Sequence, residues 1–567
     1  MRHRRQGYPS AWRRRLAAAA VAAAALLTAL PPGGAAAQAP DSAAFAAAAR
    51  RAVAEQPGPV GPGPVAGRVT VAPLYARTGH RPLWTMRGRP TGQALAVVAA
   101  LGSAEVRGLR PADYDVPALR DAAAALRQGP VASPEVLARF DVDLSRAVLR
   151  FLAHLHAGRV TASAVRFHLP DAHGELDLSA LALAVSRATD VTATLASAEP
   201  PYPGYARLVQ TLAHYRRLAA DPGLRLPPPP AGARALRPGA RREDVPALRR
   251  LLGALGDLPS GAAEPGADAD RYDEALVAAV VVFQRRHGLE PDGVVGPATL
   301  AQLRVPLDQR VRQIDLTLER WRWLPDRPPP RLVVVNIPAF RLTAVEEDGS
   351  GRRVGLRTNV IVGQAGRSGT PIFVGTMREV VFRPYWDVPP SIAVDELIPR
   401  IRRDRAYFER ERLEIVRGGD DDAVLYPLTS ANLQRVAAGT LRLRQRPGPD
   451  NSLGLVKFVF PNSYNVYLHG TPAQELFART RRDFSHGCIR VEEPAALAEF
   501  VLAGQDGWNP TTIGEAMQGT STRRVALARP VTVYVLYATV VVGEDGTVQF
   551  HPDLYGHDAV LARAIGP

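Results

Sequence analysis

The chain has 567 residues, enough for several domains, and a hydrophobic fraction of 46%, which is ample for packed cores. Its net charge of +15 is carried almost entirely by arginine, because Lys457 is the only lysine; this suits an anionic wall or membrane surface, and no base-reading motif indicates nucleic acid. The single cysteine, Cys488, excludes an intramolecular disulfide and is a candidate free reactive thiol.

The first 39 residues are predicted to be a secretory signal peptide. A basic segment ends at Arg13-Arg14-Arg15, an alanine-rich apolar stretch runs from Leu16 to Leu30, and Ala37-Gln38-Ala39 matches a small-x-small cleavage site. The apolar stretch is short for a transmembrane span. We therefore expect export to the periplasm or cell envelope; an uncleaved signal is the alternative, and it would keep the protein beside the membrane.

Residues 40–235 are predicted to hold a flexible lead-in followed by a helical domain. The lead-in, Pro40 to Val65, is rich in alanine, proline and glycine. Helical spacing of apolar side chains then extends from about Val69 to His214 and is most regular at Leu144, Val148, Phe151, Leu152 and Leu155. His154 and His156 suggest a metal site only weakly, because their i, i+2 spacing places them on different helix faces, so structural roles are expected.

Residues 240–305 are predicted to form a compact module behind a proline-rich linker. Helices are expected at Asp244–Leu255 and Tyr272–His287, and Pro297 begins a third helix after the turn Asp292–Gly296. The order Val-x-x-Leu, Ala-Val-x-x-Phe-Gln, Gly-Leu, Asp-Gly-Val-Val-Gly-x-x-Thr resembles the three-helix peptidoglycan-binding module. A generic helical bundle with a glycine turn is the alternative.

Residues 306–330 are predicted to be a connecting helix and linker, and residues 331–515 a β-rich domain. A buried strand is expected from Arg331 to Ile337, and Asp348-Gly349 indicates a hairpin. The stretch from Gly363 to Gly369 lacks the Lys-Ser/Thr ending of a phosphate loop, so a flexible connection is expected. Further strands are expected at Thr376–Phe382, Leu455–Phe460, Tyr464–His469 and Val531–Val542.

A long segment interrupts this β-rich domain over about residues 387–450. Leu397, Ile398, Ile401 and Tyr407-Phe408 have helical spacing, which predicts a helical insertion. An insertion of this size is more often functional than structureless, with a decorative surface subdomain as the alternative. Residues 516–567 are predicted to be a β-containing extension packed on the domain.

The only cysteine lies in the second of two closely spaced motifs, Tyr467-Leu-His-Gly-Thr-Pro and Ser485-His-Gly-Cys-Ile-Arg490. A thiol is a strong nucleophile only as thiolate, and a nearby imidazole is the usual means of forming one. The glycine before the cysteine permits a tight turn whose amides can face an oxyanion. A lone cysteine is nevertheless most often a small buried apolar residue.

These motifs closely resemble the active-site signature of the L,D-transpeptidase catalytic domain of bacterial peptidoglycan enzymes. The resemblance extends to Asn336-Ile-Pro338, Thr370-Pro371, Pro384–Pro389 and Pro447–Leu455, and, diffusely, to the scaffold region of large multi-domain members at Tyr75–Trp84, Gly108–Tyr114 and Asp143–Val160. It implies a multi-domain α+β chain: a helical scaffold, a three-helix peptidoglycan-binding module and a β-rich catalytic domain whose helical insertion is a lid over the active site.

The resemblance also implies roles for single residues. Cys488 is expected to be the nucleophile and His469 the base, with the Gly470 carbonyl orienting the imidazole. The amides of His486, Gly487 and Cys488 are expected at the oxyanion hole, and three neighbours are expected to order the loop or touch the peptide: Ser485, Arg490 and Tyr467. No zinc-type spacing occurs in the sequence, so neither a metal nor another cofactor is implied.

The implied reaction uses peptidoglycan stem peptides. The thiolate would attack the carbonyl of the third stem residue of a tetrapeptide, release D-alanine, and pass the acyl group to an amine of a second stem. Carbapenem β-lactams would inhibit it. The same thioester could instead be hydrolysed, as in an L,D-carboxypeptidase or a hydrolase that releases wall-linked protein. A non-catalytic wall-binding scaffold is a further alternative, which the His469/Cys488 pair disfavours.

Overall fold

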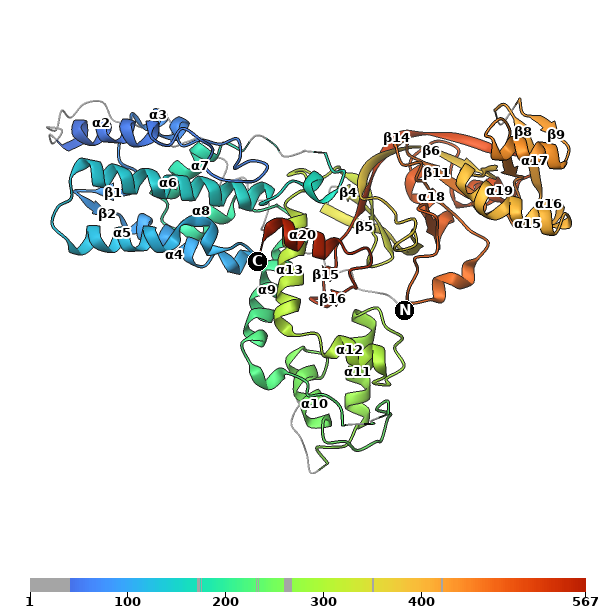
Figure 1. Cartoon of the computed structure of the whole chain (residues 1–567), viewed down its shortest axis with the longest axis horizontal. Helices are drawn as coiled ribbons and strands as arrows, with labels where there is room; N and C mark the ends of the chain where they lie inside the picture. The colour runs from blue at the N-terminus through green and yellow to red at the C-terminus, as the bar shows by residue number, and fades with distance from the viewer. Residues whose placement is uncertain are drawn as a thin grey trace.

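The computed structural model describes residues 41–170, 174, 176–230, 232, 234–259, 268–348, 351–419 and 422–566. The predicted signal peptide and Gly349 of the predicted hairpin lie outside the described residues. The molecule has three arms: a helical arm, a β-barrel arm and a shorter helical arm that projects between them (Figure 1). None of the described helices combines the length and the apolar character needed to cross a membrane.

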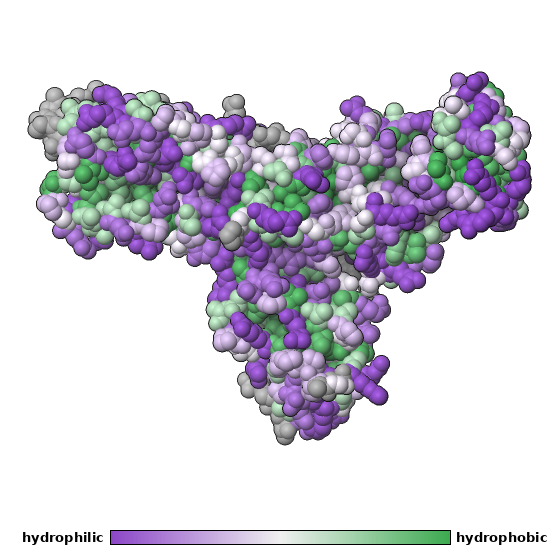
Figure 2. Space-filling view, viewed as in Figure 1, coloured by the Kyte–Doolittle hydropathy of each residue, from purple (hydrophilic) through white to green (hydrophobic). Residues whose placement is uncertain are grey.

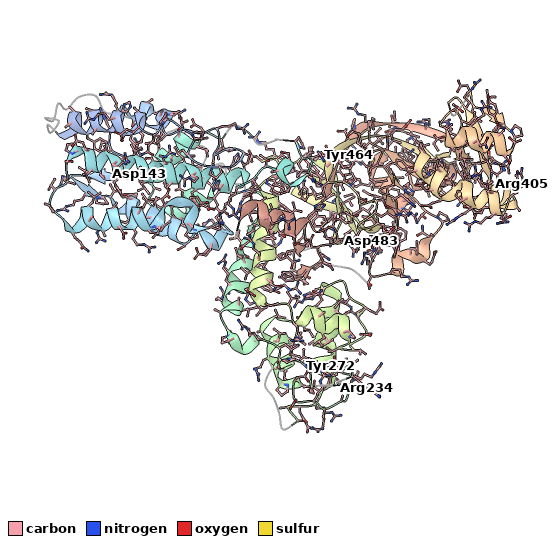
Figure 3. The ribbon with its side chains drawn as sticks, viewed as in Figure 1. Asp143, Arg234, Tyr272, Arg405, Tyr464 and Asp483 are labelled. Carbon is pink, nitrogen blue, oxygen red and sulfur yellow. The ribbon has the colours of Figure 1, made fainter. Side chains whose placement is uncertain are left out.

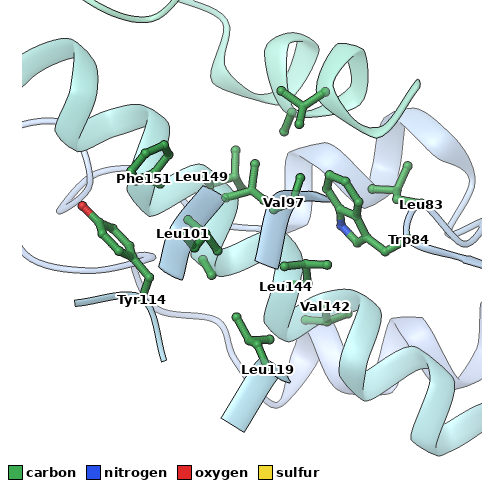
Figure 4. Packing of buried hydrophobic residues seen from close by; sticks show 14 of the residues in the cluster. Leu83, Trp84, Val97, Leu101, Tyr114, Leu119, Val142, Leu144, Leu149 and Phe151 are labelled. Carbon is green, nitrogen blue, oxygen red and sulfur yellow. The ribbon is translucent and has the colours of Figure 1, made fainter. Parts of the chain in front are cut away.

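The first arm is an all-helical domain built around the long helix α6 (Pro134–Ala157). Ser133 caps its start by accepting a hydrogen bond from the Val136 amide, and Pro134 takes the first position, where proline is favoured. Apolar side chains from the surrounding helices pack against α6 (Figure 4). These helices are α2 (Asp41–Ala54), α3 (Ala72–Thr78), α4 (Gly92–Gly102), α5 (Val116–Gln128), α7 (Leu178–Arg187) and α8 (Val191–Ala196).

The two histidines of α6 are both buried, and His154 has structural partners. Its Nδ1 lies 3.0 Å from the Tyr114 hydroxyl and its Nε2 lies 2.9 Å from the Pro62 carbonyl oxygen. Burial lowers the pKa of His154 to about 4, so its imidazole is neutral near pH 7. These contacts bind the segment around Pro62 to the helical core.

The predicted flexible lead-in is wrong for residues 41–54, which form helix α2. Phe45, Ala48, Ala49 and Ala52 are buried against α6 at the i, i+3, i+4, i+7 spacing of a helix face. Alanine is the best helix former, whereas proline and glycine are the poorest. Counting the three together as signs of flexibility concealed this short amphipathic helix.

The projecting arm contains the predicted three-helix module: α10 (Val245–Ala254), α11 (Glu274–Arg286) and α12 (Pro297–Leu303). Gln284 joins the last two helices, because its amide nitrogen donates to Asp292, Val294 and Thr299. Its amide oxygen accepts from the Gly293 amide at 2.9 Å. The paired Phe283-Gln284 and Asp292-Gly293 motifs therefore describe one buried hydrogen-bond network that fixes the turn before α12.

The third arm is a closed eight-stranded barrel in the order β11-β12-β13-β5-β4-β3-β14-β6. Helices α18 (Pro494–Leu502) and α19 (Pro510–Gln518) follow β13 in the chain and pack on the barrel. In chain order the strands are β3 (Arg331–Asn336), β4 (Arg341–Asp348), β5 (Gly351–Ile361), β6 (Phe373–Phe382), β11 (Val456–Val459), β12 (Leu468–His469), β13 (Ile489–Val491) and β14 (Arg523–Leu536).

The predicted carboxy-terminal extension, residues 516–567, is wrong at β14. This strand pairs in parallel with β3 and antiparallel with β6, so it closes the barrel instead of packing on its outside. The predicted strand Val531–Val542 covers only the inner half of β14, up to Leu536. The outer half was not predicted, because it carries exposed arginines and a register shift between Ala526 and Val531. Without β14 the edges of β3 and β6 would be open.

The residues after β14 lie where the three arms meet (Figure 1). They form the hairpin β15 (Val540–Val542) and β16 (Val548–Phe550) and helix α20 (His557–Ile565). Phe550 packs against Tyr215 of α9 (Pro203–Ala219) and His287 beside α11, and Arg310 of α13 (Leu307–Trp321) lies over its ring. One aromatic ring thus contacts α9, the three-helix module and the connecting helix α13.

The predicted insertion is a separate subdomain at the outer end of the barrel arm, where hydrophilic side chains dominate the surface (Figure 2). Its core contains the predicted apolar residues Leu397, Ile398, Ile401 and Phe408. It also contains a sheet that periodicity did not predict, in the order β7-β10-β8-β9. The elements are β7 (Trp386–Asp387), α14 (Pro390–Ile392), the π-helical turn η6 (Ala393–Leu397), α15 (Ile398–Arg403), α16 (Ala406–Arg410), β8 (Leu413–Arg417), β9 (Val424–Tyr426), α17 (Ser430–Ala437) and β10 (Arg442–Gln445).

The docking of α2 can be tested by Phe45→Ala. Removing a buried phenylalanine costs about 3 kcal/mol, so amide exchange within residues 41–54 should accelerate on the order of 100-fold. Hydrogen–deuterium exchange with mass spectrometry measures this directly. Arg50→Ala, on the exposed face of the same helix, should change exchange little. Equal protection in wild type and Phe45→Ala would show that α2 does not depend on this contact.

Candidate active site

The two predicted motifs meet on the outer face of the barrel. Leu468 and Ile489 point into the core, so the alternation of a strand places His469 and Arg490 outside. Strand register sets His469 opposite both Arg490 of β13 and Lys457 of β11. These three outward-facing residues form one line across three strands, here called the basic row.

Cys488 lies two residues before Arg490 in the chain and therefore on the same side of the strand. The Ile489 amide donates to the Tyr467 carbonyl, so the parallel ladder places Cys488 beside Tyr467 on the same outer face. The thiol is partly exposed and lies 3.6 Å from the Asn465 carbonyl oxygen. It lines a pocket of about 280 Å³ with Ser368, Gly369, Pro371, Tyr464, Asn465, Val466, His486 and Gly487.

The turn before Cys488 is held by Ser485. The Ser485 hydroxyl donates to the Cys488 carbonyl at 2.5 Å and accepts from the Gly487 amide at 3.2 Å. Gly487 has φ +116°, a conformation that side chains other than hydrogen rarely permit. The Gly487 amide therefore already has an acceptor within the turn, and the Ser485 hydroxyl joins the two ends of the turn.

His469 is buried and is held in one tautomer. Its Nδ1 donates to the Gly470 carbonyl at 2.5 Å, as predicted, which leaves Nε2 as the basic nitrogen of the neutral ring. Burial lowers the pKa of His469 to about 3, and the charges of Arg490 and Lys457 act in the same direction. The imidazole is therefore neutral in the resting site and is a proton acceptor rather than a cation.

The surroundings of Cys488 shift the pKa of its thiol in opposite directions. Burial raises the pKa of Cys488 above its ordinary value. Hydrogen bonds from Tyr467 and the positive charges of Lys457 and Arg490 lower it. Trp386 at the base of the insertion also hydrogen-bonds the Tyr467 hydroxyl, so the thiol, Tyr467 and the insertion are linked.

The stretch from Gly363 to Gly369, expected to be a flexible connection, instead supports the cysteine turn together with Thr370. Thr370 Oγ1 accepts from the Gly363 amide and donates to the Gly487 carbonyl, both at 2.8 Å. A side chain at Gly363 would lie 2.0 Å from the Ser368 carbonyl, so only glycine fits there. Tyr555, from the segment before α20, donates to the Gly363 carbonyl at 2.6 Å. Glycine content alone could not distinguish this clamped loop from a flexible one.

His486 connects the pocket to the insertion. Its Nε2 lies 2.7 Å from Glu396 Oε1 of η6, and both side chains are partly exposed. Isolated π-helical turns often occur at functional sites. The insertion therefore contacts the cysteine turn directly, while Arg405 lies at its outer end, away from Tyr464 of the pocket (Figure 3).

The first arm also reaches the pocket rim. The His168 amide donates to the Ile372 carbonyl at 2.9 Å, and the His168 ring lies 5.3 Å from the ring of Tyr464 between centroids. Figure 3 shows Tyr464 at the junction of the helical arm and the barrel. Residues that precede the barrel in the chain thus complete the rim, which no local motif indicated.

No cluster of three or more His, Cys, Asp or Glu side chains suited to a metal ion occurs among the described residues. The described site presents a thiol, an imidazole, a tyrosine hydroxyl and two fixed cations. This set suits nucleophilic acyl chemistry.

Comparison with known proteins agrees with this geometry. Residues 330–531 match the sequence model of the L,D-transpeptidase catalytic domain. The barrel is an L,D-transpeptidase catalytic domain. Residues 241–303 match the model described as "Putative peptidoglycan binding domain", and residues 69–212 match the scaffold domain. The predicted combination of helical scaffold, peptidoglycan-binding module and β-rich transpeptidase domain is confirmed.

A curated Haemophilus influenzae protein named "Putative L,D-transpeptidase" is 30% identical over 254 residues. That alignment covers 45% of this chain and 49% of the relative, so the chain spans about half the length of the relative it matches. The likeness thus supports the general function of the transpeptidase domain.

The clamp under the cysteine turn can be tested by Thr370→Val. This change leaves the Gly363 amide and the Gly487 carbonyl unpaired, which costs about 1–3 kcal/mol for each group. Amide exchange at residues 486–488 should accelerate at least about 10-fold, as measured by hydrogen–deuterium exchange. Thr358→Val is a matched control, because the buried Thr358 hydroxyl has no partner in the described part of the chain. Unchanged exchange in Thr370→Val would contradict the clamp.

Proposed function

We propose that this chain is a peptidoglycan L,D-transpeptidase that acts by acyl transfer through Cys488. The observation that carries the proposal is that the only cysteine lies at an open pocket inside an L,D-transpeptidase catalytic domain. The neighbouring strand β12 carries a buried, neutral histidine, His469. A structural cysteine would be expected inside the core, where Ile489 and Val491 lie.

The proposed first step transfers the thiol proton to His469 as sulfur attacks the carbonyl carbon of the third stem residue. The peptide bond to the terminal D-alanine breaks, the imidazolium returns the proton to the departing amine, and a thioester remains on Cys488. An amine of a second stem then attacks the thioester, loses a proton to the imidazole, and restores the thiol. The broken peptide bond supplies the energy, so no nucleotide is required.

The neighbouring groups have supporting roles in this scheme. The amides of His486 and Cys488 are the proposed oxyanion donors, since that of Gly487 is occupied. Tyr467 holds the thiol through its hydrogen bonds. Arg490, in the basic row, places a positive charge beside the developing negative charge.

The same proposal assigns partners and location. The peptidoglycan-binding domain and the scaffold domain support a stem-peptide substrate in the cell envelope. We propose export through the amino-terminal signal to the periplasm. Carbapenem β-lactams are proposed inhibitors, because an acylating ring can trap the same thiol. The basic charge is assigned to the wall and not to nucleic acid.

Incubation with purified tetrapeptide muropeptides tests the activity. Cross-linked dimers and free D-alanine should form with the wild type and be absent with Cys488→Ala, as measured by liquid chromatography and mass spectrometry. Circular dichroism should show that Cys488→Ala remains folded, because the residue is at a pocket and not in the core. Tripeptide alone would identify an L,D-carboxypeptidase, and unchanged substrate would favour a wall-binding scaffold.

The choice of base can be tested by comparing His469→Ala with His486→Ala. Loss of the proton acceptor should slow acylation of Cys488 by a factor on the order of 10²–10⁴. Loss of His486, whose ring is bound to Glu396 at the pocket rim, should have a smaller effect. Stopped-flow acylation by a carbapenem measures both variants. A larger defect in His486→Ala would reverse the two assignments.

The contact of Glu396 with His486 supports the proposal that the insertion is a lid. A closed lid excludes water and favours an amine acceptor over hydrolysis of the thioester. Glu396→Ala should therefore lower the ratio of dimer to hydrolysed tripeptide while leaving carbapenem acylation near the wild-type rate. Asp395→Ala, one residue away on the exposed side of η6, is the control. An unchanged ratio in Glu396→Ala would reduce the insertion to a surface subdomain.

A further inference from the structure

One position in this chain departs from an otherwise uniform choice of cation. Lysine and arginine together occupy 70 positions, and Lys457 is the only lysine among them. Arginine occupies all the other basic positions, both exposed ones and buried ones such as Arg286 and Arg322. The exception lies in a barrel strand beside the candidate nucleophile, so a general need for positive charge does not account for it.

Lys457 lies over the ring of Tyr467, on the outer face of the barrel. Val456 and Phe458 point into the barrel core, so Lys457 points outward into the basic row opposite His469. Its Nζ lies 4.0 Å from the centroid of the Tyr467 ring. Tyr467 is in turn the neighbour of Cys488 in the parallel ladder. An ammonium, an aromatic ring and a thiol therefore follow one another on one face.

The two basic residues differ in ways that matter at this place. The lysine ammonium is a compact point charge, whereas the arginine guanidinium is a broad planar fork that prefers to stack flat on a ring. A cation within about 6 Å of a ring centroid is attracted to the face of the ring. A compact charge can hold the Tyr467 ring from its face without displacing His469, which lies across from it.

We propose that Lys457 is a positioning residue for Cys488, whose ammonium holds the Tyr467 ring in place and, with Arg490, favours the thiolate. The proposal deepens the proposed function, since it concerns the same nucleophile. It also explains how a thiolate can be favoured when the neighbouring imidazole is neutral. Lys457 and Arg490 supply the positive charge that stabilises the thiolate, as the imidazolium does in a thiolate–imidazolium pair.

The charged and titratable groups around the thiol agree with this assignment. Tyr467 directly precedes β12, His469 lies in β12 and Arg490 lies in β13. His486, paired with Glu396 of the insertion, lines the same pocket. From the insertion, the Asp387 carboxylate acts on the Tyr467 hydroxyl. The positive charges of Lys457 and Arg490 lower the pKa of both Cys488 and His469. Burial raises the pKa of Cys488, and these charges oppose that effect while they keep the imidazole neutral.

The single cysteine makes a direct test practical. Alkylation of the folded full-length chain by iodoacetamide, followed by intact mass spectrometry between pH 5 and 10, reports only on Cys488. Lys457→Met should move the midpoint of the pH profile upward by on the order of one unit, the usual effect of a neighbouring charge. Lys457→Arg should show a smaller shift because it keeps the charge. Arg378→Met, which removes an exposed cation from β6 of the same barrel, should leave the midpoint unchanged.

Two outcomes overturn the proposal. If Lys457→Met titrates as the wild type does, Lys457 has no electrostatic role. If Lys457→Arg equals the wild type in both alkylation profile and carbapenem acylation rate, the site does not require lysine. Should Lys457→Met fail to fold, Lys457→Gln tests the electrostatic role in its place. Lys457→Arg still decides whether the site requires lysine. Alkylation needs no peptidoglycan, so a shifted midpoint without muropeptide turnover would defeat the proposed function and leave this inference standing.

Discussion

The register of strands β11, β12 and β13 is the constraint on which the candidate site depends. It sets Lys457, His469 and Arg490 in one row outside the barrel and places Tyr467 beside Cys488. A slip of one residue would send this row into the core and bring Leu468 and Ile489 to the surface. The buried apolar residues that alternate with the site therefore hold it in place. The chemistry and the packing of this face are decided by the same hydrogen-bond ladder.

Support for the cysteine turn comes from segments far away in the chain. Thr370 and Gly363 clamp the turn from the β5–β6 loop, and Tyr555 binds that loop from the carboxy-terminal segment. That segment also contains Phe550, which packs against Tyr215 of α9 and His287 of the peptidoglycan-binding module. The carboxy-terminal residues thus connect the arms to the loop under the nucleophile, which gives the non-catalytic domains a physical route to the site.

Sequence patterns predicted what is local and specific. The helical face of α6 follows from apolar spacing within one segment, whereas the Gln284 turn and the partnership of His469 with Gly470 follow from short motifs that resemble known families. Three features could not be found in this way. Helix α2 was obscured by alanine counted with proline and glycine, the outer half of β14 by its exposed arginines, and the Thr370 clamp by a pairing of residues 117 positions apart. Each depends on a distant partner, which neither periodicity nor a motif records.

The central claim is that Cys488 carries the acyl group between donor and acceptor. Rapid acid quenching of the wild type with tetrapeptide muropeptide, followed by intact mass spectrometry and peptide mapping, tests it most directly. The account predicts a transient adduct with the mass of the donor minus D-alanine, located on Cys488 and removed when an acceptor stem is added. Formation of dimers with no adduct at any time, or an adduct on another residue, would contradict it.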